Sequence, residues 1–423
     1  MSNWLSKQSG TGWSGYDRQV WLLFIGTIIN VTGMNMVMPF LSIYMYDRMG
    51  VSMTMIGLAL FIGTALSAVA SYAGGALCDR AGRKPMFMAG LVLQVIAFLL
   101  ISLAIDAGFS YWPMVAVLSI AFVIDGLYRP VPDIMIADMV SPGQRIGAYG
   151  LIRVGFNIGA VVGPVLGGAL ALFSTSYSAM FYVAAFTTLV FLAMVVTMLK
   201  DTKPTGSNDT VRLKDMLTIA GDRPFLAFCL LMALLIIPYS QMYSLLSVYS
   251  SAYLGFNTLE VGGIFAVSGL MVILFQFPIT FAIGRFRMTS ALAFGAVVFA
   301  AGFGALAISG SLAMVYFCMV VITVAEMVWV PAGATLQANM APEALRGRYF
   351  GFAGLVGSLG YAIGPMFGGL LKDGMSGHEP LMWLVIGATF LISAAGFPAL
   401  GRILPRAADS PKGAELKPEQ VVA

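Results

Sequence analysis

Twelve long apolar segments run through the 423-residue chain, and they restrict its fold more than any other feature. A helix needs about 20 predominantly apolar residues to cross the hydrocarbon core of a bilayer, and each segment meets that length. A membrane β-barrel would instead show alternating segments of about ten residues, which excludes strands. We therefore predict an all-α membrane protein with transmembrane helices over 20–45, 53–77, 86–105, 112–138, 146–172, 177–199, 224–253, 259–284, 289–309, 312–340, 346–371 and 380–403.

The composition excludes a soluble enzyme. Hydrophobic residues make up 59% of the chain and charged residues 10%, against typical values of roughly 45–50% and 25%. The three cysteines, Cys78, Cys229 and Cys318, lie far apart inside apolar segments, so we expect neither a disulfide framework nor a zinc site. A single histidine, His378, cannot form a multi-histidine metal centre. We expect no catalytic residues, no metal and no cofactor, and no binding of nucleic acid.

One polar linker divides the segments into two groups of six. We predict a six-helix bundle at 1–199, a cytoplasmic linker at 200–223, a second six-helix bundle at 224–403 and a cytoplasmic tail at 404–423. A shift of 201 residues relates the halves, aligning Asp125 with Glu326, Pro130 with Pro331, Gly163 with Gly364 and Pro164 with Pro365. Duplicated six-helix units in one orientation are typical of transporters whose site lies near the membrane midplane.

The distribution of basic residues predicts the orientation. If the N-terminus is cytoplasmic, the inner loops and both tails hold nineteen of the 23 Lys and Arg residues, and the outer loops hold two, Arg48 and Lys372. Cytoplasmic loops carry an excess of Lys and Arg. We therefore expect both termini to be cytoplasmic, in a multi-pass protein of the inner (cytoplasmic) cell membrane.

Two motifs carry a resemblance to a known family. The stretch 74–84 reads GGALCDRAGRK and resembles the signature between the second and third helices of the major facilitator superfamily. The fifth segment is similar to the glycine motif of that family's twelve-span drug:proton antiporters. The resemblance implies two pseudo-symmetric six-helix bundles. It also implies a cytoplasmic gating latch formed by Asp79, Arg80, Gly82 and Arg83, although these basic residues also suit simple positive-inside anchors.

The glycine motif occurs twice. Its members are Gly159, Gly163, Pro164, Gly167 and Gly168 in the fifth segment, repeated as Gly360, Gly364 and Pro365 in the eleventh. Glycines spaced by four form a groove that lets another helix approach closely. The resemblance implies a seam that limits leak in an antiporter, and ordinary small-residue packing is the alternative.

Six charged residues are expected at membrane depth, where charge is costly, away from the span ends that face the loops or, for Asp138, at a position that marks a functional candidate. They are Asp125, Arg129, Asp133, Asp138, Arg153 and Glu326. Asp125 and Arg129 are four residues apart on one helix face and form a plausible ion pair. Asp133 and Arg153 fall at similar depth on neighbouring segments, so we predict a structural ion pair between them.

Glu326 differs because the sequence around it, VITVAEMVWVP, is apolar. Apolar surroundings favour the protonated form of a carboxylic acid, as proton coupling requires. Relatives in the antiporter branch carry acids in settings similar to those of Glu326 and Asp138. We predict Glu326, Asp125 and Asp138 as proton-coupling residues; a hydrogen-bonded structural role for Glu326 and simple solvation of Asp138 are the alternatives.

Polar and aromatic residues near these charges are the predicted cavity lining. Amides within a span require polar surroundings, and aromatic rings attract cations. The predicted substrate-cavity residues are Asn30, Asn35, Arg129, Tyr239, Gln241, Tyr243 and Trp329.

These observations predict a monomeric transporter that exports lipophilic cationic drugs or amphiphiles by alternating access, driven by the proton gradient. Its expected partners are the small-molecule substrate, protons and membrane lipid. The first alternative is a facilitator or proton symporter for a small polar solute, such as a sugar, nucleoside or peptide. A non-transporting membrane receptor is a remote alternative.

Overall fold

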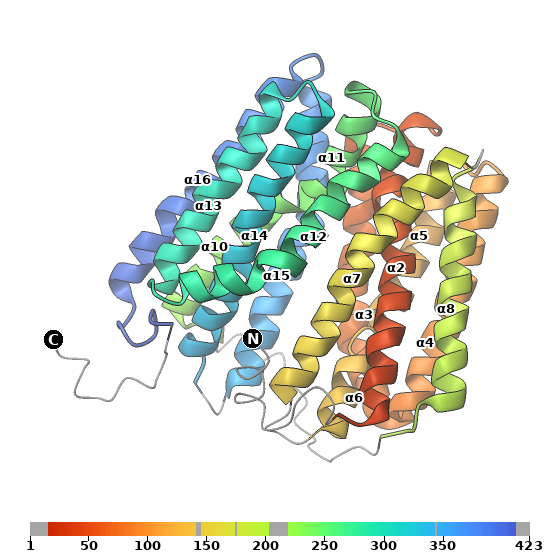
Figure 1. Ribbon diagram of the computed structural model, residues 1–423, viewed down its shortest axis with the longest axis horizontal. Coiled ribbons are helices and arrows are strands. Elements are labelled where there is room, and N and C mark those ends of the chain that lie inside the picture. Colours follow the sequence, from red (N-terminus) through yellow and green to blue (C-terminus); the bar gives the residue numbers. More distant parts are fainter. Residues whose placement is uncertain (1–15, 141–144, 174–175, 203–218, 343–344, 412–423) are drawn as a thin grey trace. The chain divides into compact units, whose positions relative to one another are not determined.

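The computed structural model describes residues 16–140, 145–173, 176–202, 219–342 and 345–411. Within these ranges the regular elements are helices, and no strand occurs. Twelve helical stretches are long and apolar enough to span a membrane, which confirms the predicted fold class (Figure 1). The orientation of the termini remains a prediction.

Within the described residues, the first half contains seven helices because its fourth span is broken. The helices are α2 (Arg18–Asp47), α3 (Met53–Ala81), α4 (Arg83–Asp106), α5 (Tyr111–Tyr128), α6 (Val131–Met139), α7 (Arg145–Phe173) and α8 (Ser178–Met198). The break lies at Arg129 and Pro130, between α5 and α6. Proline has no N–H and cannot donate the helical hydrogen bond. The segment 112–138 is therefore two helices rather than the single one that its hydropathy predicts.

The second half has a longer interruption. Its elements are α10 (Arg223–Tyr239), η3 (Ser240–Met242), α11 (Leu245–Val248), η4 (Tyr249–Tyr253), α12 (Thr258–Ile283), α13 (Met288–Ala305), η5 (Leu306–Ile308), α14 (Leu312–Met340), α15 (Arg346–Gly374) and α16 (Glu379–Ile403). The seventh span changes from α-helix to a 3₁₀ turn directly after Pro238, and η4 is a π-helical turn. Such interruptions are tolerated at membrane depth where they are buried in protein or line a cavity.

The described residues group into two compact units. The first unit comprises 16–49, 62–202 and 257–269, and the second comprises 50–61, 219–256 and 270–411. Each unit therefore takes the first turns of one helix, α12 or α3, from the other half of the sequence. In the first unit α2 packs against α7 and α8; in the second, α13 packs against α14 and α16. The predicted division into bundles 1–199 and 224–403 remains a prediction.

The glycine motif explains the pairing of α7 with α2. A Cβ added at Gly159 or Gly163 would lie 2.8 Å from Val31 or 2.7 Å from the Thr32 carbonyl oxygen of α2. At Gly167 it would overlap the Met36 carbonyl. Close approach of two backbones thus requires glycine at every fourth position of α7.

The repeated glycine motif in α15 allows a similarly close approach to α10 in the second unit. A Cβ at Gly360 or Gly364 would meet the carbonyl oxygen of Ala233 or Ile237 on α10, at 3.2 and 2.6 Å. Gly168 and Gly369 face third helices: Gly168 lies against Thr258 of α12, and Gly369 against Met53 of α3. The sequence repeat is therefore also a repeat of packing.

The segment after α16 packs against the second unit, although the sequence suggests only a polar tail at 404–423. Asp409 is 0% exposed. Its carboxylate accepts hydrogen bonds from the backbone N–H and hydroxyl of Thr289, both at 2.7 Å, and pairs with Arg287 Nε at 2.7 Å. Asn339 of α14 donates to the carbonyl oxygens of Ala408 and Ser410. These contacts join the segment 404–411 to α13 and α14.

Candidate functional site

The second unit places Glu326 among aromatic side chains. Glu326 is half-buried on α14. The side chains of Tyr239 and Tyr243 both lie close enough to Glu326 to interact electrostatically with its carboxylate. Both tyrosines lie at the interruption of the seventh span, where α10 gives way to η3. Three predicted site residues, from two spans far apart in sequence, are therefore brought together.

Trp329 completes this cluster from the next turn of α14. Its ring centroid lies 5.2 Å from that of Tyr239 and 5.9 Å from that of Phe299. Phe299 in turn stacks on Phe390 of α16 at 5.1 Å. Trp329 Nε1 donates to the sulfur of Met232 at 3.4 Å. The carboxylate of Glu326 thus has a wall of rings beside it, whose faces attract cations.

Gln241 has a different role from the predicted cavity lining. Its side chain is 0% exposed and donates to the carbonyl oxygens of Ile237 and Gly364. A Cβ at Gly368 would overlap its Oε1 atom. Gln241 therefore lies in the glycine groove of α15, where it links α10 and η3 to that helix.

The first unit contains a second polar group, around Asp125. Arg129 Nη2 pairs with Asp125 Oδ2 at 2.6 Å, as the spacing of four residues predicts. The Asp125 side chain is buried, whereas that of Arg129 is 68% exposed. The pair lies at the end of α5, directly before the break at Pro130.

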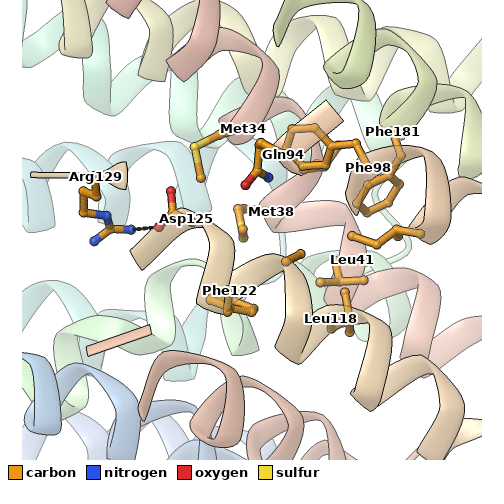
Figure 2. A pocket seen from close by; sticks show the side chains of 13 residues that line it. Met34, Met38, Leu41, Gln94, Phe98, Leu118, Phe122, Asp125, Arg129 and Phe181 are labelled. Atoms are coloured by element: carbon orange, nitrogen blue, oxygen red, sulfur yellow. Dashed lines mark hydrogen bonds and ion pairs between the residues drawn. The ribbon is translucent and has the colours of Figure 1, made fainter. Parts of the chain in front are cut away.

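A cavity of about 50 Å³ adjoins this pair. Its lining comes from α2, α4, α5 and α8 and consists of Met34, Val37, Met38, Leu41, Gln94, Phe98, Ile101, Leu118, Ala121, Phe122, Asp125, Arg129 and Phe181. Figure 2 shows Met34, Met38, Gln94 and Asp125 converging at one end. The predicted cavity residue Arg129 and the predicted acid Asp125 therefore do border a cavity, within the first unit.

The two asparagines of α2 differ in their surroundings. Asn35 donates to the Val31 carbonyl of its own helix at 3.1 Å, and its Cβ lies against Gly163. Asn30 has a buried Oδ1 atom without a hydrogen-bond partner among the described residues. Asn35 thus belongs to the packing between α2 and α7, and Asn30 to the polar group around Asp125.

Arg83, in the signature 74–84, forms an ion pair with Asp138, which the sequence predicts as a proton-coupling residue. Arg83, which is 5% exposed, contacts Asp138 Oδ2 through Nε at 3.2 Å and donates to the Cys78 carbonyl. The Thr202 hydroxyl also donates to Asp138. Gly82 has a φ of 91°, in the left-handed region that favours glycine. The side chains of Asp79 and Arg80 lie outside the described part of the structure.

This geometry predicts the outcome of Asp138→Asn. If the chain couples transport to protons, as the sequence predicts, we expect that coupling to persist, because the Asp138 carboxylate contacts Arg83. We expect the free energy of unfolding to fall by about 0.5–1.5 kcal/mol, because asparagine keeps an acceptor oxygen for Arg83 but lacks the charge that strengthens this hydrogen bond. Transport in vesicles and thermal unfolding of the purified protein check the two parts. Abolished coupling in a stably folded variant would contradict the assignment.

Asp133 and Arg153 are not brought together. Both side chains are exposed. Among the described residues no ion pair joins them; the Asp133 carbonyl instead accepts from the Tyr149 hydroxyl at 3.0 Å. The break at Pro130 places Asp133 in the first turn of the separate helix α6, so depth counted along a continuous helix did not locate it.

Sequence reasoning missed two residues beside Asp125. Gln94 is 2% exposed and Tyr128 is 3% exposed. Gln94 could have been found as an isolated amide within an apolar span. Tyr128 carries no such signal, because tyrosine is common at span ends. Within the described residues no group of three or more His, Cys, Asp or Glu could hold a metal.

Several curated proteins are similar to this chain along most of its length. An uncharacterized MFS-type transporter of Bacillus subtilis, YttB, is 29% identical over 89% of this chain and 92% of that protein. A Na⁺, Li⁺, K⁺/H⁺ antiporter of Planococcus maritimus is 28% identical, covering 83% and 89%. The multidrug resistance protein MdtH of Edwardsiella ictaluri is 26% identical, covering 89% and 92%.

Solved structures share the fold at low sequence identity. A POT family transporter in complex with 5-aminolevulinic acid superposes with a TM-score of 0.78 at 14% identity, covering 93% of this chain and 98% of that one. The nucleoside transporter NupG gives 0.77 at 15%, covering 90% and 100%. A family model described as Major Facilitator Superfamily matches residues 23–365. The chain therefore belongs to the Major Facilitator Superfamily and is a transporter, not an enzyme.

Proposed function

We propose that this protein is a proton-coupled exporter of lipophilic cations, and that Glu326 carries the coupled proton. The supporting observation is the position of Glu326 within electrostatic range of Tyr239, whose ring packs against that of Trp329. A carboxylate at membrane depth is a functional candidate by default. A phenol can hydrogen-bond either the ionised or the protonated acid, so a nearby phenol suits both states of a transport cycle.

The exchange follows from competition at one carboxylate. Ionised Glu326 attracts the cationic group of a substrate, and the rings of Tyr239 and Trp329 add cation–π attraction. A proton arriving from the outer side neutralises the acid and releases the cation. Because proton and substrate exclude each other at this position, their movements are opposed. Exchange of one proton for one monovalent cation moves no net charge, so the pH gradient alone drives a one-for-one cycle.

Two relatives favour this reading of the substrate and the coupling. One is named a multidrug resistance protein and another a cation/proton antiporter. The glycine motif in α7, with its copy in α15, resembles that of antiporters. We further propose cytoplasmic termini and residence in the inner cell membrane, from the excess of basic residues in the inner loops.

A second candidate is a facilitator or proton symporter for a small polar solute. Structural neighbours include a POT family transporter and a nucleoside transporter, which supports this alternative on the fold alone. The two candidates differ in direction: an exporter accumulates substrate in inside-out vesicles, whereas a symporter accumulates it in right-side-out vesicles.

Glu326→Gln tests the proposal. Inside-out vesicles containing the protein would be prepared with a lumen more acidic than the medium. The fluorescent cation ethidium would then be added to the medium. We expect wild-type vesicles to accumulate ethidium until the gradient is collapsed. Vesicles with Glu326→Gln should accumulate no more than vesicles without the protein, because glutamine cannot exchange a proton.

Asp133→Asn is the matched control, since it removes an exposed acid on α6 and should leave uptake unchanged. Equal uptake by wild type and Glu326→Gln would exclude Glu326 as the coupling acid. Gradient-dependent uptake of a dipeptide or nucleoside in right-side-out vesicles, with no ethidium accumulation, would establish the second candidate instead.

A further inference from the structure

Pro331 interrupts the hydrogen bonding of α14 shortly after Glu326. Proline has no N–H, so in a helix the carbonyl group four residues earlier loses its usual donor. For Pro331 that carbonyl belongs to Met327, the residue next to Glu326, and α14 nevertheless continues from Leu312 to Met340. The repeat-related Pro130 lies where the fourth span breaks into α5 and α6. The two prolines thus affect their spans differently, and the continuous helix needs another donor at Met327.

That donor is the side chain of Gln276 on α12. Its Nε2 atom donates to the Met327 carbonyl oxygen at 3.0 Å. The same nitrogen also donates to the Thr280 hydroxyl oxygen at 3.0 Å, so both amide hydrogens are used. A carbonyl oxygen only accepts, so the nitrogen rather than the oxygen of the amide faces Met327. A neighbouring helix thereby supplies the hydrogen bond that Pro331 removes.

The surroundings of both groups make this contact valuable. Gln276 is half-buried within the apolar stretch VILFQFPITF at 272–281, where an amide without a partner would be costly. Met327 is 0% exposed, so bulk water does not reach its carbonyl oxygen. A buried carbonyl without a donor is unfavourable. Each group therefore satisfies the other across the interface between α12 and α14.

The turn of α14 that Gln276 contacts carries both side chains of the proposed site. Glu326 directly precedes Met327, and Trp329 follows two residues later. Residues three apart share a helix face, so the carboxylate and the indole project from the same side. The ring of Trp329 lies 5.2 Å from that of Tyr239. A change in the bend or rotation of α14 at Met327 therefore moves the carboxylate and the indole together relative to Tyr239.

We propose that Gln276 is a positioning residue for the site at Glu326. Its amide replaces the helical hydrogen bond that Pro331 cannot make, and it thereby fixes the turn on which Glu326 and Trp329 meet substrate and proton. This role rests on the export function proposed above. Because Gln276 acts through the Met327 carbonyl, a backbone donor at position 331 makes its amide dispensable.

Removing and restoring this one hydrogen bond tests the role. Gln276→Met keeps the length of the side chain but cannot donate, and Pro331→Ala supplies a backbone N–H for the Met327 carbonyl. We expect gradient-driven ethidium uptake into inside-out vesicles to be about threefold to tenfold slower in Gln276→Met, the factor that corresponds to one hydrogen bond. In the Pro331→Ala background the same substitution should change uptake by less than about twofold, because the two positions are coupled through one acceptor.

Fluorine NMR of the purified protein labelled with fluorotryptophan measures the position of the turn without transport. Of the six tryptophan resonances, the one lost in Trp329→Phe belongs to Trp329. Gln276→Met should shift this resonance in the protein with Pro331 and leave it unshifted in the Pro331→Ala background. Thr280→Val is the matched control: it removes the second, exposed acceptor of the amide on α12 and should leave uptake and resonance as in wild type.

Three results would overturn the proposal. The first is a Gln276→Met protein whose Trp329 resonance is unshifted, or whose uptake equals that of an active wild type. The second is an equal effect of Gln276→Met in both backgrounds, which would show that the side chain acts by packing. The third is a Gln276→Met protein that does not fold and is not recovered by Pro331→Ala. Wild-type vesicles that accumulate no ethidium would overturn the export function instead, and the resonance would still decide whether Gln276 positions the turn.

Discussion

Replacing Asp409 with alanine is expected to lower the free energy of unfolding by at least about 2 kcal/mol, because the buried N–H and hydroxyl of Thr289 lose their acceptor at about 1–3 kcal/mol each. The carboxylate is fully buried and receives hydrogen bonds from Thr289 and Arg287. It also caps the N-terminus of α13, where negative charge is favourable. Thermal unfolding of the purified protein, with size-exclusion chromatography for dispersity, measures the effect.

Two further variants separate the causes. Asp409→Asn keeps the size of the side chain and an acceptor oxygen for Thr289 but loses the charge, so we expect an intermediate loss. Asp133→Ala removes an exposed aspartate from α6 and should change stability by less than about 0.5 kcal/mol. If Asp409→Ala has the same melting temperature as wild type, the contacts of the segment 404–411 do not stabilise the second unit.

Gly167→Leu is expected to prevent α7 from packing on α2. Even a Cβ at this position overlaps the Met36 backbone, which cannot move aside as a flexible side chain could. Overpacking usually costs about 1–3 kcal/mol, and more where backbone must shift. We expect little monodisperse protein from membranes, measured by fluorescence-detected size-exclusion chromatography of a tagged chain.

Gly150→Leu is the matched control on the same helix. No atom lies within 4 Å of a Cβ built at Gly150. Leucine has the higher helix propensity, so this variant should be as well folded as wild type or better. Equal yields of the two variants would show that the spacing-four glycines of α7 do not determine its approach to α2.

Helix existence was predictable because the bilayer acts as a solvent of nearly constant thickness. Hydropathy and length alone locate twelve spans within a few residues, and the break in the fourth span occurs at Pro130, a residue with no N–H. The pairing of Asp125 with Arg129 was equally predictable, since residues four apart on one helix share a face.

Contacts between helices were predictable only where close approach of two backbones requires glycine at fixed positions of the sequence. Glycines at every fourth position identify the close face of α7, and the repeat carries the same information to α15. A shared face does not name the partner, however. That α7 packs against α2 and also lies against the first turns of α12 is a result of the tertiary structure.

The polar sites show the same limit. Arg83 with Asp138, Asp409 with Thr289, and Gln94 near Asp125 join residues many positions apart. Whether such groups meet depends on the rotation and offset of each helix, which differ by a few ångströms without changing hydropathy. Depth counting also failed for Asp133 and Arg153 once Pro130 had interrupted the span.

Residue type therefore determines that this chain crosses the membrane twelve times. It also determines where glycine permits close packing and where proline interrupts a helix, because these effects act within one segment. Which carboxylate lies near a phenol, which pairs with arginine, and which oxygens remain without a partner depend on contacts among several helices. Glu326, Asp138 and Asp125 are all acids in predicted spans. Only packing gives the first a tyrosine, the second a buried arginine and the third a cavity.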